Sequence, residues 1–115
     1  MAKVMLVDDD RTTVKLLRTL LELDGFNVIT VERGREVMDK VISFQPHLIL
    51  MDYHLDDIEG TDVIKQIRAA GLDIPIVMAS GMDVSKEAME AGANKFLIKP
   101  FEPDELPGLI RQLIG

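Results

Sequence analysis

Residues 48–52 read Leu-Ile-Leu-Met-Asp, so four consecutive apolar residues run directly into a carboxylate. An apolar run of this length, without polar alternation, is typical of a strand buried on both faces of a parallel sheet. The run at residues 4–7, Val-Met-Leu-Val, has the same character and is followed by Asp8-Asp9-Asp10. The chain therefore places acidic residues directly after two strands that we expect to be buried.

Short apolar runs of this kind alternate with amphipathic stretches along the whole chain. Strict βα alternation predicts a parallel sheet with right-handed crossovers and helices on both faces. Five strands suit the flavodoxin-like (βα)5 fold, a doubly wound α/β sheet with strand order 2-1-3-4-5. The expected strands are Val4–Val7, Val28–Val31, Leu48–Met51, Ile76–Ala79 and Phe96–Ile98.

The ends of several helices are also marked in the sequence. Gly25, Gly71 and Gly92 stand where C-terminal glycines would end the first, third and fourth helices. The fourth helix, roughly residues 84–91, has the weakest apolar stripe. Pro103 suits the start of the fifth helix, but Pro107 lacks an N–H, so we expect its regular part to begin late or to bend.

Composition limits the possible functions. The 115 residues, 47% apolar and 29% charged, suit one globular domain over residues 1–115. A net charge of −7 argues against unaided binding of nucleic acid, which needs a basic face. No apolar run approaches a membrane span, and no secretory signal is visible. The absence of cysteine excludes disulfides and thiol chemistry. We expect a cytoplasmic protein that does not contact membranes.

Residues that could take part in chemistry or bind a metal stand at the ends of four of the five expected strands. In a doubly wound sheet, the site forms at the carboxyl ends of the strands, near the switch in strand order. Asp10 suits a helix cap, but the other acids would repel one another unless a cation neutralises them. Mg²⁺ prefers a few carboxylates together with water and phosphate oxygens. The candidate site residues are Asp8, Asp9, Asp52, Ser80 and Lys99.

This set of residues suits phosphoryl transfer to a carboxylate. A carboxylate such as Asp52 can attack phosphorus to give an aspartyl phosphate. The reaction needs positioning and charge neutralisation more than elaborate covalent machinery. Mg²⁺ would bridge the acids and the phosphoryl oxygens, while Lys99 and the Ser80 hydroxyl would bind other oxygens.

Four segments together resemble the receiver domain of two-component response regulators, in the CheY-like superfamily. The resemblance extends from Lys3 to about Ile114. Each segment is weak alone, but all four occur in order on successive elements. They are Val4–Asp9, Leu48–Gly60, Pro75–Gly81 and Lys95–Phe101.

The resemblance implies a role for each acidic residue. Asp52 is similar to the phosphoacceptor of the family. Asp8 and Asp9 resemble the acidic pair that holds Mg²⁺, with Asp9 favoured as the direct ligand. His54 stands where the family contributes a backbone carbonyl to the metal, so its imidazole need not bind.

The resemblance also implies a switch. Ser80 matches the hydroxyl residue that moves toward the phosphoryl group, and Lys99 matches the lysine of the family motif. Pro100 resembles a proline that follows a cis bond. Phe96 stands at the aromatic switch position, without the hydroxyl of a tyrosine. The chain departs from the family at Asp56, where many members have proline.

The expected partners follow from the same resemblance. A sensor histidine kinase or a phosphotransfer protein would donate the phosphoryl group. Phosphorylation would change the face formed by the fourth helix, the fifth strand and the fifth helix, and so control a downstream protein or an output domain. The chain is either a stand-alone receiver or one domain of a longer regulator or hybrid kinase. We expect no enzyme activity beyond weak hydrolysis of its own acyl phosphate.

Three alternatives remain open at this point. Residues 8–12, Asp-Asp-Asp-Arg-Thr, match the D-x-D-x-T pattern of haloacid-dehalogenase-type phosphatases, in which the first Asp is the nucleophile. That function would leave Asp52 without a role, and the chain lacks the length that those enzymes use. A degenerate receiver that only binds partners is disfavoured by the intact acids and Lys99. A flavin-binding flavodoxin is disfavoured because three acids would repel its phosphate.

Overall fold

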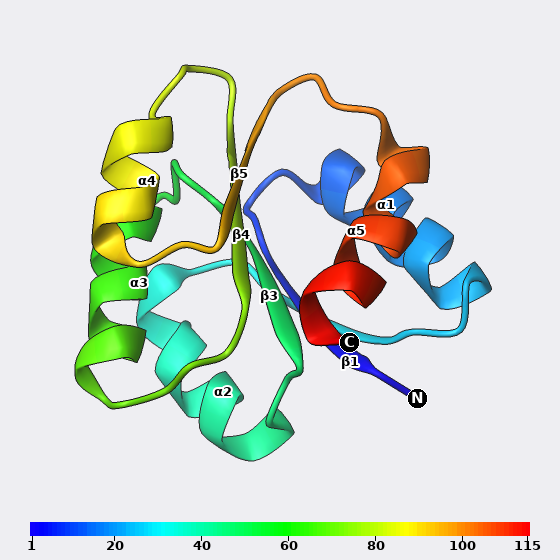
Figure 1. The fold of residues 1–115 in the computed structure, drawn as a ribbon, viewed down its shortest axis with the longest axis horizontal. Helices are drawn as coiled ribbons and strands as arrows, with labels where there is room; N and C mark the ends of the chain where they lie inside the picture. The colour runs from blue at the N-terminus through cyan, green and yellow to red at the C-terminus, as the bar shows by residue number, and fades with distance from the viewer.

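A computed structural model describes all residues, 1–115, and contains one five-stranded parallel sheet (Figure 1). The strand order is β2-β1-β3-β4-β5, so the predicted fold class and strand order are confirmed. Each expected strand is present, and all five begin or end one residue beyond the expected range. The strands are β1 Lys3–Val7, β2 Asn27–Val31, β3 Leu48–Asp52, β4 Ile76–Ser80 and β5 Lys95–Ile98.

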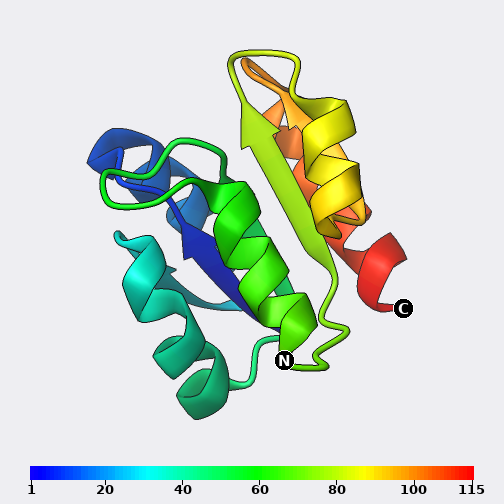
Figure 2. The same cartoon turned by 90° about the vertical axis from the view of Figure 1, so that its left-hand side faces the viewer.

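Helices cover both faces of the sheet (Figures 1 and 2). Helices α1 (Arg11–Leu23) and α5 (Leu106–Ile114) lie together on one face. The opposite face carries α2 (Val37–Phe44), α3 (Gly60–Ala69) and α4 (Ser85–Ala91). This arrangement leaves the loops after the strand ends free to form a site at one edge of the sheet.

The side chains of the central strands alternate between two cores. In β1, Met5 packs on the side of α2, α3 and α4, and Leu6 packs on the side of α1 and α5. Ile49 and Leu50 of β3 divide in the same way. Because both faces are covered, polar residues at either kind of position would be buried without water. This explains why these strands are continuous apolar runs.

The helix ends agree with the expectations from sequence. Asp10 caps α1, since its side chain accepts a hydrogen bond from the Thr12 N–H. A 3₁₀ turn at Pro103–Glu105 precedes α5, whose regular part begins at Leu106, as the position of Pro107 predicted. The three glycines singled out above, Gly25, Gly71 and Gly92, all have positive φ. No helix has both the length and the apolarity that crossing a membrane requires.

Candidate functional site

The acidic residues that follow β1 and end β3 meet at one point of the sheet edge. Strands β1 and β3 are neighbours, and Val7 pairs with Met51, so the residues that come next lie side by side. Carboxylate oxygens of Asp8, Asp9 and Asp52 all lie within 4.8 Å of one another. The structure therefore brings together three of the acids that sequence reasoning selected.

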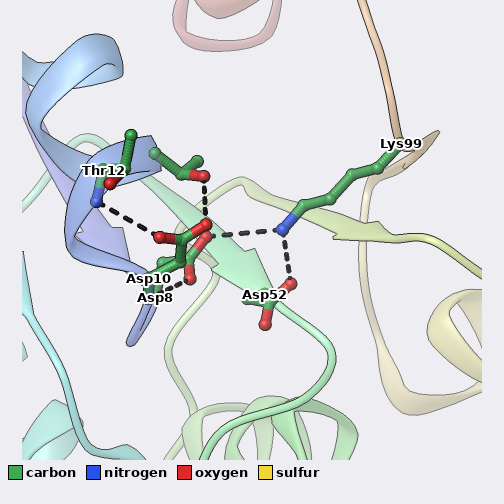
Figure 3. A network of polar contacts seen from close by, with 6 residues as sticks. Asp8, Asp10, Thr12, Asp52 and Lys99 are labelled. Carbon is green, nitrogen blue, oxygen red and sulfur yellow. Dashed lines mark hydrogen bonds and ion pairs between the residues drawn. The ribbon is translucent and has the colours of Figure 1, made fainter.

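Lys99 reaches this acidic cluster from the end of β5 (Figure 3). Its Nζ lies 2.8 Å from Oδ1 of Asp52 and 3.4 Å from Oδ2 of Asp8. The backbone N–H of Lys99 donates to the carbonyl of Ser80 at 2.8 Å, and the following bond to Pro100 is cis, as expected. The side chains of Asp8 and Asp52 are each only 12% exposed, so this ion-pair network is shielded from solvent.

Burial and charge oppose each other in this network. Burial raises the pKa of Asp52 and outweighs the hydrogen bond from Lys99, which acts to lower it. For Lys99, burial acts to lower the pKa, but the hydrogen bond to Asp52 and the charge of Asp8 outweigh it and raise the pKa. Lys99 therefore remains a cation at neutral pH, while the buried Asp52 carboxylate lacks full compensation for its charge.

Asp56 adds a further acid to the site. Burial is the largest cause that raises the pKa of Asp9, and the neighbouring carboxyl groups of Asp56 and Asp8 raise it further. Asp56 itself is exposed. The residue that departs from the family pattern thus adds negative charge near Asp9, as expected from the sequence.

The donor set fits a hard divalent cation. Asp8, Asp9 and Asp52 offer only carboxylate oxygens, which Mg²⁺ prefers over nitrogen or sulfur. Lys99 is the one cation whose ion pairs enter the cluster, so a single positive charge faces three carboxylates. A bound Mg²⁺ would remove the remaining repulsion between them.

The other predicted site residues form no hydrogen bond with Asp52. Ser80 is buried at the end of β4, where its Oγ accepts a hydrogen bond from the Met82 N–H at 3.1 Å. Phe96 is half-buried on β5, opposite Met78, and packs against the core beneath α2, α3 and α4. The His54 side chain is exposed, while its backbone forms a bridge with Glu59.

Two further residues shape the site, and sequence reasoning did not assign them a role. A Cβ added at Gly60 would lie 2.4 Å from the carbonyl oxygen of Asp52, so only glycine allows this approach. Asp57 accepts hydrogen bonds from the backbone of Gly34 and Arg35. Gly60 ends the segment Leu48–Gly60 that resembles the receiver family, so that resemblance could have pointed to it. Nothing in the sequence links Asp57 to Gly34 and Arg35, which lie more than twenty positions earlier.

Comparisons with known proteins agree with this geometry. The family model described as "Response regulator receiver domain" matches residues 4–111. The chain is 33% identical over 115 residues to the cell cycle transcriptional regulator CtrA of Caulobacter vibrioides, covering 97% of the chain and 50% of CtrA. It is 34% identical to the alkaline phosphatase synthesis transcriptional regulatory protein PhoP of Bacillus subtilis, covering 97% of the chain and 48% of PhoP. The chain thus spans about half the length of these relatives.

Solved structures show the same likeness. A putative response regulator from Chloroflexus aurantiacus superposes with a TM-score of 0.89 at 30% identity, covering 98% of this chain and 97% of that one. The chemotaxis response regulator CheY4 of Vibrio cholerae superposes with a TM-score of 0.90 at 27% identity, covering 98% of each chain. The chain therefore belongs to the response regulator receiver domain family of two-component signalling systems.

Proposed function

We propose that this receiver accepts a phosphoryl group on Asp52, in a reaction that depends on Mg²⁺. One observation carries the proposal: Lys99 contacts Asp52 at 2.8 Å in a cluster where the oxygens of three carboxylates lie within 4.8 Å. Such crowding of carboxylates is unfavourable unless a cation neutralises their charge, and strongly perturbed ionisable groups of this kind cluster at functional sites. A sensor histidine kinase or a phosphotransfer protein would be the donor, in keeping with the family.

The transfer step is a displacement at phosphorus. An oxygen of Asp52 forms the new P–O bond, while the P–N bond of the donor phosphohistidine breaks and the imidazole leaves with the bonding electron pair. Because Asp52 is already held by Lys99, the nucleophile is oriented before the donor arrives. Asp8, Asp9, Asp52 and the His54 carbonyl would hold Mg²⁺, which would supply positive charge that neutralises the phosphoryl oxygens.

Ser80 and Phe96 would convert the phosphorylation into a change of surface. The Ser80 Oγ accepts from Met82 and keeps its own proton, so it can rotate and donate to a phosphoryl oxygen. That rotation gives up the contact that fixes the loop between β4 and α4. Phe96 would then move toward the space near Ser80. The face formed by α4, β5 and α5 changes its affinity for a partner only as far as the phosphoryl group favours one of the two states.

The output would be a downstream protein or an attached output domain. CtrA and PhoP are transcriptional regulators by name and are about twice as long as the matched segment. This domain has a net charge of −7, so we assign any DNA contact to another domain and not to this one. We further propose that the domain speeds hydrolysis of its own aspartyl phosphate.

The rival phosphatase function has less support. It would need Asp8 as nucleophile, with Asp10 as the second acid of the D-x-D pattern. Asp10 is exposed, and its carboxylate accepts hydrogen bonds from the Thr12 N–H and from the Thr13 Oγ at 2.7 Å. The Asp10 carboxylate therefore caps α1, and it takes no part in the ion pairs of Lys99.

Intact mass spectrometry after incubation with a small phosphodonor tests the proposal. We expect one phosphoryl group on the wild type with Mg²⁺, and none with EDTA or in Asp52→Asn. Asp104→Asn, which removes an exposed acid elsewhere, should label like the wild type. Undiminished labelling of Asp52→Asn would refute Asp52 as acceptor and favour the phosphatase function.

A further inference from the structure

Asp57 joins two loops that are distant in the sequence. Its Oδ1 accepts a hydrogen bond from the Gly34 N–H at 2.9 Å, and its Oδ2 accepts one from the Arg35 N–H at 3.1 Å. Both donors belong to a 3₁₀ turn, Gly34–Glu36, that connects β2 to α2. N–H groups in the first turn of a helix have no partner inside it, so the carboxylate satisfies two otherwise unpaired donors.

The two loops are also in close van der Waals contact at this point. Gly34 is buried, and a Cβ added there would lie 2.2 Å from Cγ2 of Ile58 and 2.9 Å from Cγ2 of Val63. Ile58 is the residue after Asp57. The connection between β2 and α2 therefore touches the loop between β3 and α3 by hydrogen bonds and by tight packing at adjacent positions.

The loop that Asp57 holds carries the proposed backbone ligand of the metal site. The base of this loop is closed by the bridge between His54 and Glu59 and by the Gly60 N–H, which donates to the Tyr53 carbonyl at 2.7 Å. Asp57 fixes the opposite end of the loop. His54 is itself part of the bridge at the base, two residues after Asp52 and three residues before Asp57.

The charge state of Asp57 suits this role. Desolvation acts to raise the pKa of Asp57, but the hydrogen bonds from the Arg35 and Gly34 N–H groups outweigh it and lower the pKa. The carboxylate is therefore ionised at neutral pH, and hydrogen bonds to an ionised acceptor are the stronger kind.

We propose that Asp57 is a positioning residue of the Mg²⁺ site. It fastens the loop between β3 and α3 to the turn after β2, and so holds the His54 carbonyl where it completes the set formed by Asp8, Asp9 and Asp52. Asp57 contacts neither the metal nor the phosphoryl group and acts only through the backbone. This inference rests on the proposed function, because it assumes that the acidic cluster binds Mg²⁺.

A purely structural role for Asp57 makes a different prediction. A residue that only stabilises the fold would, when changed, lower the melting temperature and leave Mg²⁺ affinity unaltered in the folded protein. Loss of a residue that orients a metal ligand typically lowers metal affinity by 10- to 100-fold. Only one carbonyl ligand is affected here, so we expect a loss of about 10-fold, at the lower end of that range.

The experiment is an NMR titration of the folded domain with Mg²⁺, which measures the dissociation constant without any phosphodonor. Asp57→Ala should weaken Mg²⁺ binding by about 10-fold and speed hydrogen exchange of the Gly34 and Arg35 amides. Asp57→Asn keeps one acceptor oxygen and should fall between Asp57→Ala and the wild type. Asp62→Asn removes an exposed acid just after the same loop and should bind Mg²⁺ like the wild type.

The Mg²⁺ dependence of phosphorylation gives a second readout. At saturating Mg²⁺, Asp57→Ala should reach the wild-type rate, because only the affinity for the metal has changed. Equal Mg²⁺ affinity in Asp57→Ala and the wild type, with or without a lower melting temperature, would overturn this inference alone. A wild type that binds no Mg²⁺ would overturn both the inference and the proposed function.

Discussion

Replacing Gly60 with alanine tests how tightly the backbone beside the phosphoacceptor is held. The new Cβ would lie 2.4 Å from the Asp52 carbonyl oxygen and 2.7 Å from Cε of Met78. An ordinary contact begins near 3.4 Å, so the Asp52 backbone must move by about 1 Å or α3 must shift. Neither movement is easy, because the Gly60 N–H is hydrogen-bonded to the Tyr53 carbonyl and Asp52 pairs with Ala79 of β4.

The cost can be worked out for both stability and rate. Inserting a methyl group into a closely packed site costs about 1 to 3 kcal/mol. With an unfolding entropy of about 2.1 cal/mol/K per residue, a domain of this length loses about 4 °C in Tm for each kcal/mol, hence about 4 to 12 °C. A displacement of about 1 Å in a reacting group can cost about 100-fold in rate. We therefore expect Gly60→Ala to be phosphorylated about 10- to 100-fold more slowly.

Gly108→Ala is the matched control. Gly108 lies in α5 and has no atom within 4 Å of an added Cβ. In a helix this change stabilises by about 0.5 to 1 kcal/mol, so its Tm should rise by about 2 to 4 °C with no change in rate. Thermal unfolding and the rate of phosphorylation by a small donor, both in Mg²⁺, measure the two effects. A Gly60→Ala protein with wild-type Tm and rate would refute the close approach, and a lowered Tm with an unchanged rate would refute its effect on Asp52.

Three other predictions concern the metal, pH and the opposite end of the sheet. Mg²⁺ at 100 times its dissociation constant should stabilise the domain by about 2.7 kcal/mol in urea unfolding, and Asp9→Asn should lose most of this gain. Because burial raises the pKa of Asp52 above its ordinary value of 3.8, the native state binds the proton more tightly than the unfolded state. In EDTA, the contribution of Asp52 to stability should therefore fall as pH rises from that value through the raised pKa, and Asp52→Asn should flatten this slope. Arg68 donates to the carbonyls of Gly92 and Leu72 and to the Asn94 side chain, so Arg68→Ala should cost about 2 kcal/mol in urea unfolding. Lysine should not restore this loss, because it lacks the guanidinium fork; full rescue by Arg68→Lys would contradict the assignment.

Much of the fold followed from local patterns in the sequence. The apolar run at residues 48–51 has to be buried on both faces, which requires a parallel sheet with helices on both sides. The late start of α5 followed from Pro107, whose ring and missing N–H act on the neighbouring turn. The position of the site also followed, because the carboxyl ends of parallel strands share one edge and Asp8 and Asp52 stand at two of them.

Sequence patterns did not predict which loops contact each other or which rotamers the side chains of the site adopt. The contact of Asp57 with the turn at Gly34 joins residues more than twenty positions apart, and no periodicity links them. The Ser80 hydroxyl is hydrogen-bonded to the Met82 N–H and not to Asp52, a choice between rotamers that depends on its surroundings. The reason is physical: the sequence by itself determined the strands, the helices and the acids at the sheet edge, because these depend on local burial and backbone chemistry. The tertiary structure alone decided the contacts between loops and the ion pairs of Lys99, because these depend on how distant elements pack together.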